Sequence, residues 1–458
     1  MISTSDNHTI QTQMIDKSRR PDVSLVFSEG TENSGESKNL ALYLCGLLAK
    51  AGYSNLFLIG LDAATGGPTM TLPPSKRILF SAVGADMSSK KNIVEIPAAD
   101  VTPAYLDKLQ TSKVVIVTVN SNDMPALKRQ LVDMLDPKRQ GTPGKITIFS
   151  IQRGVRNADV IKGAFTGRKD VAVVEGVVGF AVVVHPKTGA LCPTTQHPTI
   201  IFERLSKEIE DIADGPLRLM ENTDLQSHFD KTLTPYSWGV MLWECLFAIN
   251  VLTGGTIRDT LLSDAQNAAL SRQVLAAMVR ECRLALKAAA RNGPWQPQFR
   301  LLSSVLTPWL WEMLLSLPWP LSGKNLVTFC CWLTGVLPPQ GIISPGQLDL
   351  AEGRKTMCEC HLGELMATGS RHSIDMPVCS AVMAKITAME AGVKAFVPGA
   401  GQGNSAVLLD LHAELVGKLG VGGKVASKSR AEARFWLLRL LALLSLVPLV
   451  WFLLIHEH

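Results

Sequence analysis

The sequence predicts an α/β protein in which a domain with a parallel sheet precedes a mostly α-helical domain and a transmembrane helix at the carboxyl end. Short apolar runs rich in β-branched residues alternate with helical segments in the first part of the chain. Only helical patterns follow residue 225, and the last apolar segment has the length of a membrane span. With 458 residues, the chain is long enough for two or three domains with cores of their own.

Six apolar runs of the first domain have the length of strands that are buried on both faces. They comprise residues 23–27, 56–60, 78–81, 93–96, 114–119 and 146–150. Between the first two, apolar residues recur at helical spacing from Asn39 to Ala51, and Gly52 ends the helix. Such units build a Rossmann-like parallel sheet, which binds ligands at the carboxyl ends of its strands. Residues 171–184 and 199–202 predict a hairpin that completes the domain.

The second domain is predicted to be mostly α-helical. Helices are expected over residues 236–252, 263–292, 346–370 and 375–392. The very apolar segment 299–337 raises the alternative of a membrane span. Pro318, Lys324 and other prolines and charges interrupt it before ~20 apolar residues accumulate, which favours buried helices instead.

The two ends of the chain differ from the domains between them. Residues 1–21 are polar and contain no apolar run, which predicts a disordered lead without a secretory signal. Residues 435–455 contain one charged residue, Arg439, and two tryptophans near the ends, as a single-pass membrane anchor does. The basic residues of the Gly-rich linker 398–434 predict that the large domains face the cytosol, from the endoplasmic reticulum or the mitochondrial outer membrane. A carboxyl-terminal core helix is the alternative.

Composition excludes some classes of function. The net charge of +5 and the aromatic content of 6% give no indication of nucleic-acid binding. Nine cysteines in scattered positions indicate reduced thiols. Zinc at Cys358-Glu-Cys360-His361 is the alternative, but residues one or two apart on a helix point in different directions and no second ligand pair follows, so we expect no metal. His361 and His372 have no acidic or nucleophilic partner at a recognisable spacing.

One motif and several supporting segments carry a resemblance to a known family. The motif is Asp349-Leu-Ala-Glu-Gly-Arg-Lys-Thr356, with Gly363 and Pro377 after it, and the supporting segments are 150–157, 175–183 and 238–255. Over residues 22–405, their order and spacing resemble the ketopantoate reductase (2-dehydropantoate 2-reductase) family. The resemblance implies a dinucleotide-binding domain at 22–225, a helical domain at 226–397, and an oxidoreductase that reduces a small 2-oxo acid with NADPH in the cleft between them.

The resemblance also implies where the ligands would bind. The NADP cofactor would contact Gly30, Asn120, Gln152 and Gly154. The substrate would contact Asn250 and Ser344.

Several positions depart from the family pattern. The general-acid lysine, two residues after the tryptophan of a W-x-K motif, is Val240, and the glutamate that follows the R-x-T run is Met357. The asparagine one turn after the lysine is Glu244, and the asparagine of the Q-N-G turn is Arg153. Only the middle glycine of the G-x-G-x-x-G fingerprint, Gly30, remains. The catalytic residues are therefore unknown, and a missing general acid alone typically lowers the rate ~10²–10⁴-fold.

Three hypotheses for the function follow. The chain is a reductase of the ketopantoate type, with a 2-oxo acid as its substrate. Alternatively, it is a catalytically inactive relative that serves as a membrane-tethered binding or scaffold protein, with membrane lipid as a partner of its last helix. In the third hypothesis it is an accessory subunit of a membrane protein complex.

Overall fold

The computed structural model describes both predicted domains, with gaps. The described residues are 21–29, 35–53, 55–62, 77–81, 93–97, 101–103, 109, 111–136, 145–184, 188–195, 198–204, 225–256, 258, 260, 266–290, 343–392, 411 and 413.

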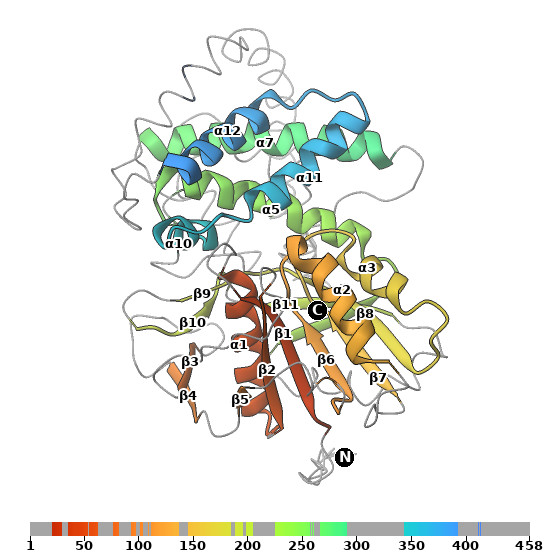
Figure 1. Cartoon of the computed structure of the whole chain (residues 1–458). Helices are drawn as coiled ribbons and strands as arrows, with labels where there is room; N and C mark the ends of the chain where they lie inside the picture. Colours follow the sequence, from red (N-terminus) through yellow and green to blue (C-terminus); the bar gives the residue numbers. More distant parts are fainter. Residues whose placement is uncertain are drawn as a thin grey trace, which may run out of the picture.

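The first domain is built on an eight-stranded sheet with the strand order β12-β11-β8-β7-β6-β1-β2-β5 (Figure 1). All neighbouring strands are parallel except β11 and β8. The sheet confirms the predicted α/β, Rossmann-like class. Its strands are β1 (Val23–Glu29), β2 (Leu56–Asp62), β5 (Val101–Pro103), β6 (Val114–Val117), β7 (Ile146–Ser150), β8 (Val171–Val178), β11 (Thr199–Glu203) and β12 (Gln226–Asp230).

Helices cover both faces of this sheet because alternate residues of each buried strand point to opposite sides. Leu25 and Phe27 of β1 pack into one core with the apolar side chains of α1 (Glu36–Lys50). Val26 packs on the other face with Leu127 of α2 (Met124–Met134) and Ile161 of α3 (Asn157–Ala164). The amino-terminal end of α1 therefore lies at the carboxyl end of β1, where open α/β sheets bind their ligands.

A second sheet of four strands corrects part of the predicted topology. Its strand order is β4-β3-β10-β9, with bounds Ile93–Pro97, Arg77–Ser81, Leu191–Pro193 and Val182–Val184. The runs at 78–81 and 93–96 were expected in the main sheet, but they pair antiparallel with each other. The predicted hairpin is also divided: β8 pairs with β11, whereas the chain turns at residues 179–181 and continues as β9, which pairs with β10.

The described part of the second domain is α-helical, as predicted, and stands above the carboxyl ends of the main sheet (Figure 1). The predicted helix 346–370 is two helices, because Glu352 ends the first and Gly353 turns the chain with a φ of +70°. The strand β12, which follows residue 225, still belongs to the main sheet. The helices are α5 (Thr234–Thr253), α7 (Gln266–Ala289), α10 (Pro345–Ala351), α11 (Cys358–Arg371) and α12 (Pro377–Gly392).

Within the described ranges, no helix combines the length and the hydropathy that crossing a membrane requires. The segments 1–20, 299–337 and 435–455 lie outside those ranges, as does all of 398–434 except two positions. The predicted lead, linker and anchor, and the predicted buried helices at 299–337, remain predictions.

The turn between β7 and α3 depends on Gly154, which has a φ of +113°. A Cβ atom there would lie 2.8 Å from Ser121 Oγ and 3.1 Å from Asn157 Nδ2. We expect Gly154→Ala to lower the free energy of unfolding by about 1–3 kcal/mol, measured by urea denaturation. Gly163→Ala is the matched control, because that position in α3 has open space around it and alanine favours a helix. Equal stability of the two variants would contradict this account of the turn.

Candidate functional site

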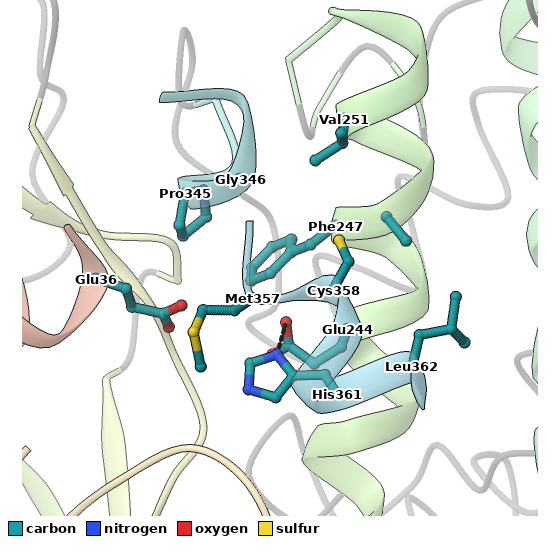
Figure 2. A pocket seen from close by; sticks show the side chains of 11 residues that line it. Glu36, Glu244, Phe247, Val251, Pro345, Gly346, Met357, Cys358, His361 and Leu362 are labelled. Atoms are coloured by element: carbon teal, nitrogen blue, oxygen red, sulfur yellow. Dashed lines mark ion pairs between the residues drawn. The ribbon is translucent and has the colours of Figure 1, made fainter. Parts of the chain in front are cut away.

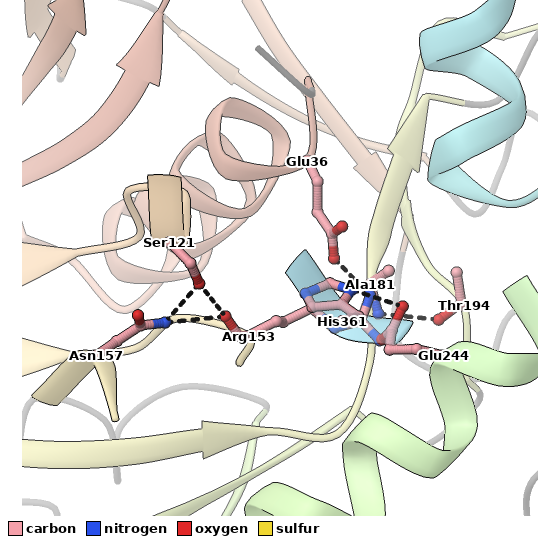
Figure 3. A network of polar contacts seen from close by, with 8 residues as sticks. All are labelled: Glu36, Ser121, Arg153, Asn157, Ala181, Thr194, Glu244 and His361. Atoms are coloured by element: carbon pink, nitrogen blue, oxygen red, sulfur yellow. Dashed lines mark hydrogen bonds and ion pairs between the residues drawn. The ribbon is translucent and has the colours of Figure 1, made fainter. Parts of the chain in front are cut away.

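The candidate site lies where the carboxyl ends of β1, β6 and β7 meet the helical domain. Four polar side chains from different elements converge there (Figure 3). Glu36 opens α1, Arg153 follows β7, Glu244 lies in the middle of α5, and His361 lies on α11. The site therefore joins the two domains.

An arginine connects the two domains by ion pairs. Arg153 Nη1 lies 2.5 Å from Glu36 Oε1 within the first domain, and the Arg153 guanidinium also pairs with Glu244 on α5. The Phe247 ring of α5 lies beside the guanidinium, with its centroid 5.1 Å from Cζ. The three charged side chains are at most 8% exposed, so water screens their attraction very little. Loss of the arginine would leave two carboxylates buried without their counter-charge.

His361 continues this network from the other side of Glu244. Its Nδ1 lies 3.1 Å from Glu244 Oε2 (Figure 2), so the neutral imidazole donates the Nδ1–H to that carboxylate. Burial, with a smaller contribution from the nearby positive charge of Arg153, lowers the pKa of His361 to about 4. The Nε2 atom is buried and has no hydrogen-bond partner among the described residues. The expectation that His361 lacks an acidic partner is wrong, because Glu244 is 117 positions away in the chain and only the fold brings the two together.

The amino-terminal end of α1 receives a second carboxylate from the helical domain. The Gly35 backbone N–H donates to Asp349 Oδ1 of α10 at 3.0 Å. Arg354 binds the same oxygen through Nε at 3.1 Å and Nη2 at 3.0 Å. A Cβ atom at position 35 would lie 2.8 Å from Arg354 Nη2, so a larger residue there would shift the end of the arginine side chain. Asp349 thus lies at the helix end where Rossmann-like domains hold a pyrophosphate.

Little open space remains between the described side chains of the site. A cavity of about 20 Å³, measured as the space open to the centre of a water molecule, lies between Glu36 on one side and Glu244, Met357 and His361 on the other (Figure 2). A second cavity of about 10 Å³ lies beside Arg153. One water requires at least ~10–15 Å³ on this measure, so the two cavities hold about one water molecule each at most.

The residues that the resemblance assigned to the cofactor are only partly brought together. Asn120 follows β6, donates its backbone N–H to Ser28 Oγ at 2.8 Å, and lines the smaller cavity. Gln152 is buried and contacts Ser150 and Met124, away from both cavities. Gly154 forms the turn before α3. Gly30 lies outside the described residues, so its predicted role is not tested.

The residues assigned to the substrate serve the packing of α5 on its neighbours. Asn250 Nδ2 donates to Thr260 Oγ1 at 2.6 Å and to the Thr256 carbonyl at 3.2 Å. Ser344 precedes α10 and is fully buried, and its hydroxyl has no hydrogen-bond partner in the described part of the chain. Neither residue lines the two cavities.

The position of the family lysine has become part of an apolar core. Val240 of α5 packs with Val177 and Ile201 of the main sheet in a cluster that also holds Leu233 and Tyr236. The charged ammonium group of a lysine at this position would have to leave the apolar cluster. Val240 therefore contributes packing, and no charge, to the contact between the domains.

Comparison with known proteins establishes the fold. No family model matches the sequence, and no curated protein matches it. A PanE/ApbA family ketopantoate reductase from Ralstonia eutropha JMP134 has a similar structure, with 14% identity, a TM-score of 0.50 and coverage of 81% of this chain and 98% of that one. The chain has the fold of the ketopantoate reductases. The resemblance predicted from the sequence is confirmed to this extent.

Two further structures are similar at slightly lower scores. The 2-dehydropantoate 2-reductase from Geobacter metallireducens GS-15 is 14% identical, with a TM-score of 0.49 and coverage of 81% of this chain and 100% of that one. A D-mandelate dehydrogenase, in a complex with NADH and anilino(oxo)acetate, is 11% identical, with a TM-score of 0.48 and coverage of 80% and 98%.

The described residues do not fit a nicotinamide dinucleotide. Asp349 accepts the backbone N–H at the amino-terminal end of α1, and Glu36 adds a carboxylate in its first turn. The Glu36 carboxylate would repel a pyrophosphate at this helix end. Arg153 fills the space between α1 and α5, and the cavities beside it hold single water molecules at most.

The lowered pKa of His361 has a consequence for stability. Between its ordinary value of 6.5 and about pH 4, the unfolded chain takes up a proton at this residue and the folded chain does not. Stability is therefore lost as the pH falls through this range, by an amount on the order of 3 kcal/mol from this residue. We expect His361→Gln to remove this part of the pH dependence in urea denaturation from pH 7 to 4. The exposed His372→Gln is the control, and an unchanged pH profile in His361→Gln would contradict the shift.

Proposed function

We propose that this chain is a non-catalytic relative of the 2-oxo acid reductases that binds no nicotinamide dinucleotide and serves as a binding or scaffold protein. The observation that carries the proposal is the pairing of Arg153 with Glu36 and Glu244 across the cleft between the domains. In a reductase of this architecture, cofactor and substrate meet in that cleft. In this chain, the charged side chains of Arg153, Glu36 and Glu244 fill that cleft.

The exchanged residues compensate one another, which supports the proposal further. Arg153 and Glu244 each stand where the family pattern has an asparagine, and they form an ion pair with each other. Val240, in place of the lysine, packs in an apolar cluster with the main sheet. Random loss of catalytic residues would leave buried polar groups without partners, at a cost of ~1–3 kcal/mol each. The substitutions instead form a set that stabilises the closed arrangement.

A second candidate function rests on the Glu244–His361 pair. A carboxylate that accepts the Nδ1–H of an imidazole leaves a lone pair on Nε2, and the His361 side chain lines the larger cavity (Figure 2). With a pKa of about 4, the imidazole is neutral at pH 7. It would accept the proton of a hydroxyl group, which suits a dehydrogenase of a 2-hydroxy acid better than a reductase of a 2-oxo acid.

Binding of nucleotide separates the two candidates. We expect no change in nucleotide fluorescence when NADPH or NADH is titrated to millimolar concentration into the full chain, because carboxylates occupy the pyrophosphate position. A dissociation constant in the micromolar range would overturn the proposal. Oxidation of a 2-hydroxy acid with NAD or NADP would then favour the second candidate.

If the chain oxidises a 2-hydroxy acid, a variant of His361 tests whether this residue is the catalytic base. His361→Gln would lower such turnover by about 10²-fold or more, because glutamine can donate to Glu244 but cannot accept a proton at pH 7. His372→Gln, which changes an exposed histidine at the end of the same helix, would leave it unchanged. Equal loss in both variants would point to a general effect on folding.

We also propose that residues 435–455 anchor the chain in a membrane, with the two domains on the cytosolic side. Support comes from the sequence: 21 residues with one charge, preceded by a basic segment. After expression in a eukaryotic cell, the full chain is expected in the membrane pellet after an alkaline carbonate wash. A chain that ends at residue 429 is expected in the supernatant. Release of the full chain by carbonate would remove the anchor.

A further inference from the structure

Three buried cysteines meet in the core of the helical domain. Cys245 lies on α5, Cys282 on α7 and Cys379 in the first turn of α12. Cys282 Sγ lies 3.8 Å from Cys245 Sγ and 3.7 Å from Cys379 Sγ, so the sulfur atoms are in contact. All three residues are 0% exposed. The three helices therefore touch through thiols, and Cys282 is the thiol that both contacts share.

These contacts place the sulfur atoms within reach of a disulfide. An S–S bond is about 2.04 Å long, so each sulfur of a pair would have to move by only about 0.9 Å. The partners of Cys282 are 37 and 97 positions away in the chain, so the bond would join helices that only the fold brings together. Because Cys282 can form one such bond at a time, the third cysteine stays a thiol in contact with the bonded Cys282 sulfur.

The surroundings keep the thiols protonated at pH 7. The contacts with Cys245 and Cys379, and then burial, raise the pKa of Cys282 well above its ordinary value. The contact with Cys282 lowers the pKa of Cys379, but burial and the neighbouring Cys245 and Glu281 outweigh it and raise this pKa to about 12. Glu281 of α7 also accepts the backbone N–H of Cys379 at 2.9 Å. Because the thiolate is the reactive form, oxidation is slow, and the contacts between the sulfurs decide its product.

We propose that these three cysteines form a disulfide site, in which Cys282 bonds to Cys379 or to Cys245 when the chain is exposed to hydrogen peroxide. One thiol loses its proton and attacks the peroxide, the O–O bond breaks, and a sulfenic acid and a water form. A neighbouring thiol then attacks the sulfenic sulfur. The S–S bond forms, and the hydroxide leaves as water with the proton of that thiol. Two thiols are thereby oxidised to a disulfide, and the peroxide is reduced to two waters.

The shared contact has two consequences. A sulfenic acid at any of the three positions lies against a thiol, so the site should yield disulfide and little sulfinic acid. The third thiol can attack the bonded Cys282 sulfur, so the bond can pass between Cys379 and Cys245. It would fasten α7 either to α12 or to α5, the helix that carries Glu244. The site requires no nucleotide, so this inference is independent of the proposed function.

The test maps the cross-links in the full chain. The native chain is treated with hydrogen peroxide, its remaining thiols are alkylated, and the non-reduced chain is digested with trypsin for mass spectrometry. Cleavage after lysine and arginine puts the three cysteines in separate peptides, 232–258, 281–283 and 372–385. We expect peptide 281–283 linked to each of the other two, and both links lost after treatment with dithiothreitol. Links of Cys282 that form in urea but not in native buffer would overturn the inference, as would equally abundant links to Cys45.

Variants show whether the shared contact determines the product. Cys282→Ala removes the common partner, and we expect the fraction of Cys379 recovered as sulfinic acid to rise at least about fivefold over the wild type. Cys45→Ala is the matched control with wild-type yields, because Cys45 is equally buried but packs in the core of the first domain.

Cys379→Ala should leave only the link between Cys245 and Cys282, and it serves as the test if Cys282→Ala does not fold. An unchanged yield of sulfinic acid in folded Cys282→Ala would contradict the inference, because another group would then protect the sulfenic acid. Folding of each variant is checked by far-UV circular dichroism and thermal unfolding.

Discussion

The contact between the two domains depends on the buried charge of Arg153. The guanidinium is the shared counter-ion of Glu36 in the first domain and Glu244 in the second. Ionised carboxylates in a water-excluded interface are costly unless they are paired. Separation of the domains would leave Glu244 without its arginine, whereas Arg153 and Glu36 would still pair within the first domain. The closed arrangement is therefore the one in which all three charges keep partners. His361 fits the same requirement, since a neutral imidazole adds a donor to Glu244 without adding a charge.

A second contact between the domains lies at the amino-terminal end of α1. In a Rossmann-like domain, the exposed N–H groups at this helix end are satisfied by a phosphate of the cofactor. Here Asp349 satisfies the Gly35 N–H from the opposite domain, and Arg354 holds the carboxylate in place. The end of the Arg354 side chain lies close to Gly35, so a larger residue there would displace it.

Much of the fold could be predicted from the sequence, because buried strands and amphipathic helices leave local periodic patterns. The runs at 23–27 and 114–119 predicted buried strands in this way, and β1 and β6 form there. The second sheet could not be predicted, because the pattern of an apolar run does not determine which strand it pairs with. The strands Arg77–Ser81 and Ile93–Pro97 pair with each other instead of joining the main sheet. The split between α10 and α11 depends on one glycine with positive φ, and helix periodicity continues across it.

The site was less predictable than the fold, because its contacts join residues far apart in the chain. Departures from the family pattern could be recognised at Arg153, Glu244 and Met357. From the sequence alone, each of them indicates only that a family residue is missing. Opposite charges at Arg153 and Glu244 were the available signal that two departures belonged together. The sequence did not indicate that Glu36 and Asp349 belong to the site. Glu36 is typical of an acidic residue in the first turn of a helix, and Asp349 is part of the family motif. What the three-dimensional contacts add is that Arg153 and Glu244, two departures of opposite charge, bind each other where the two domains meet.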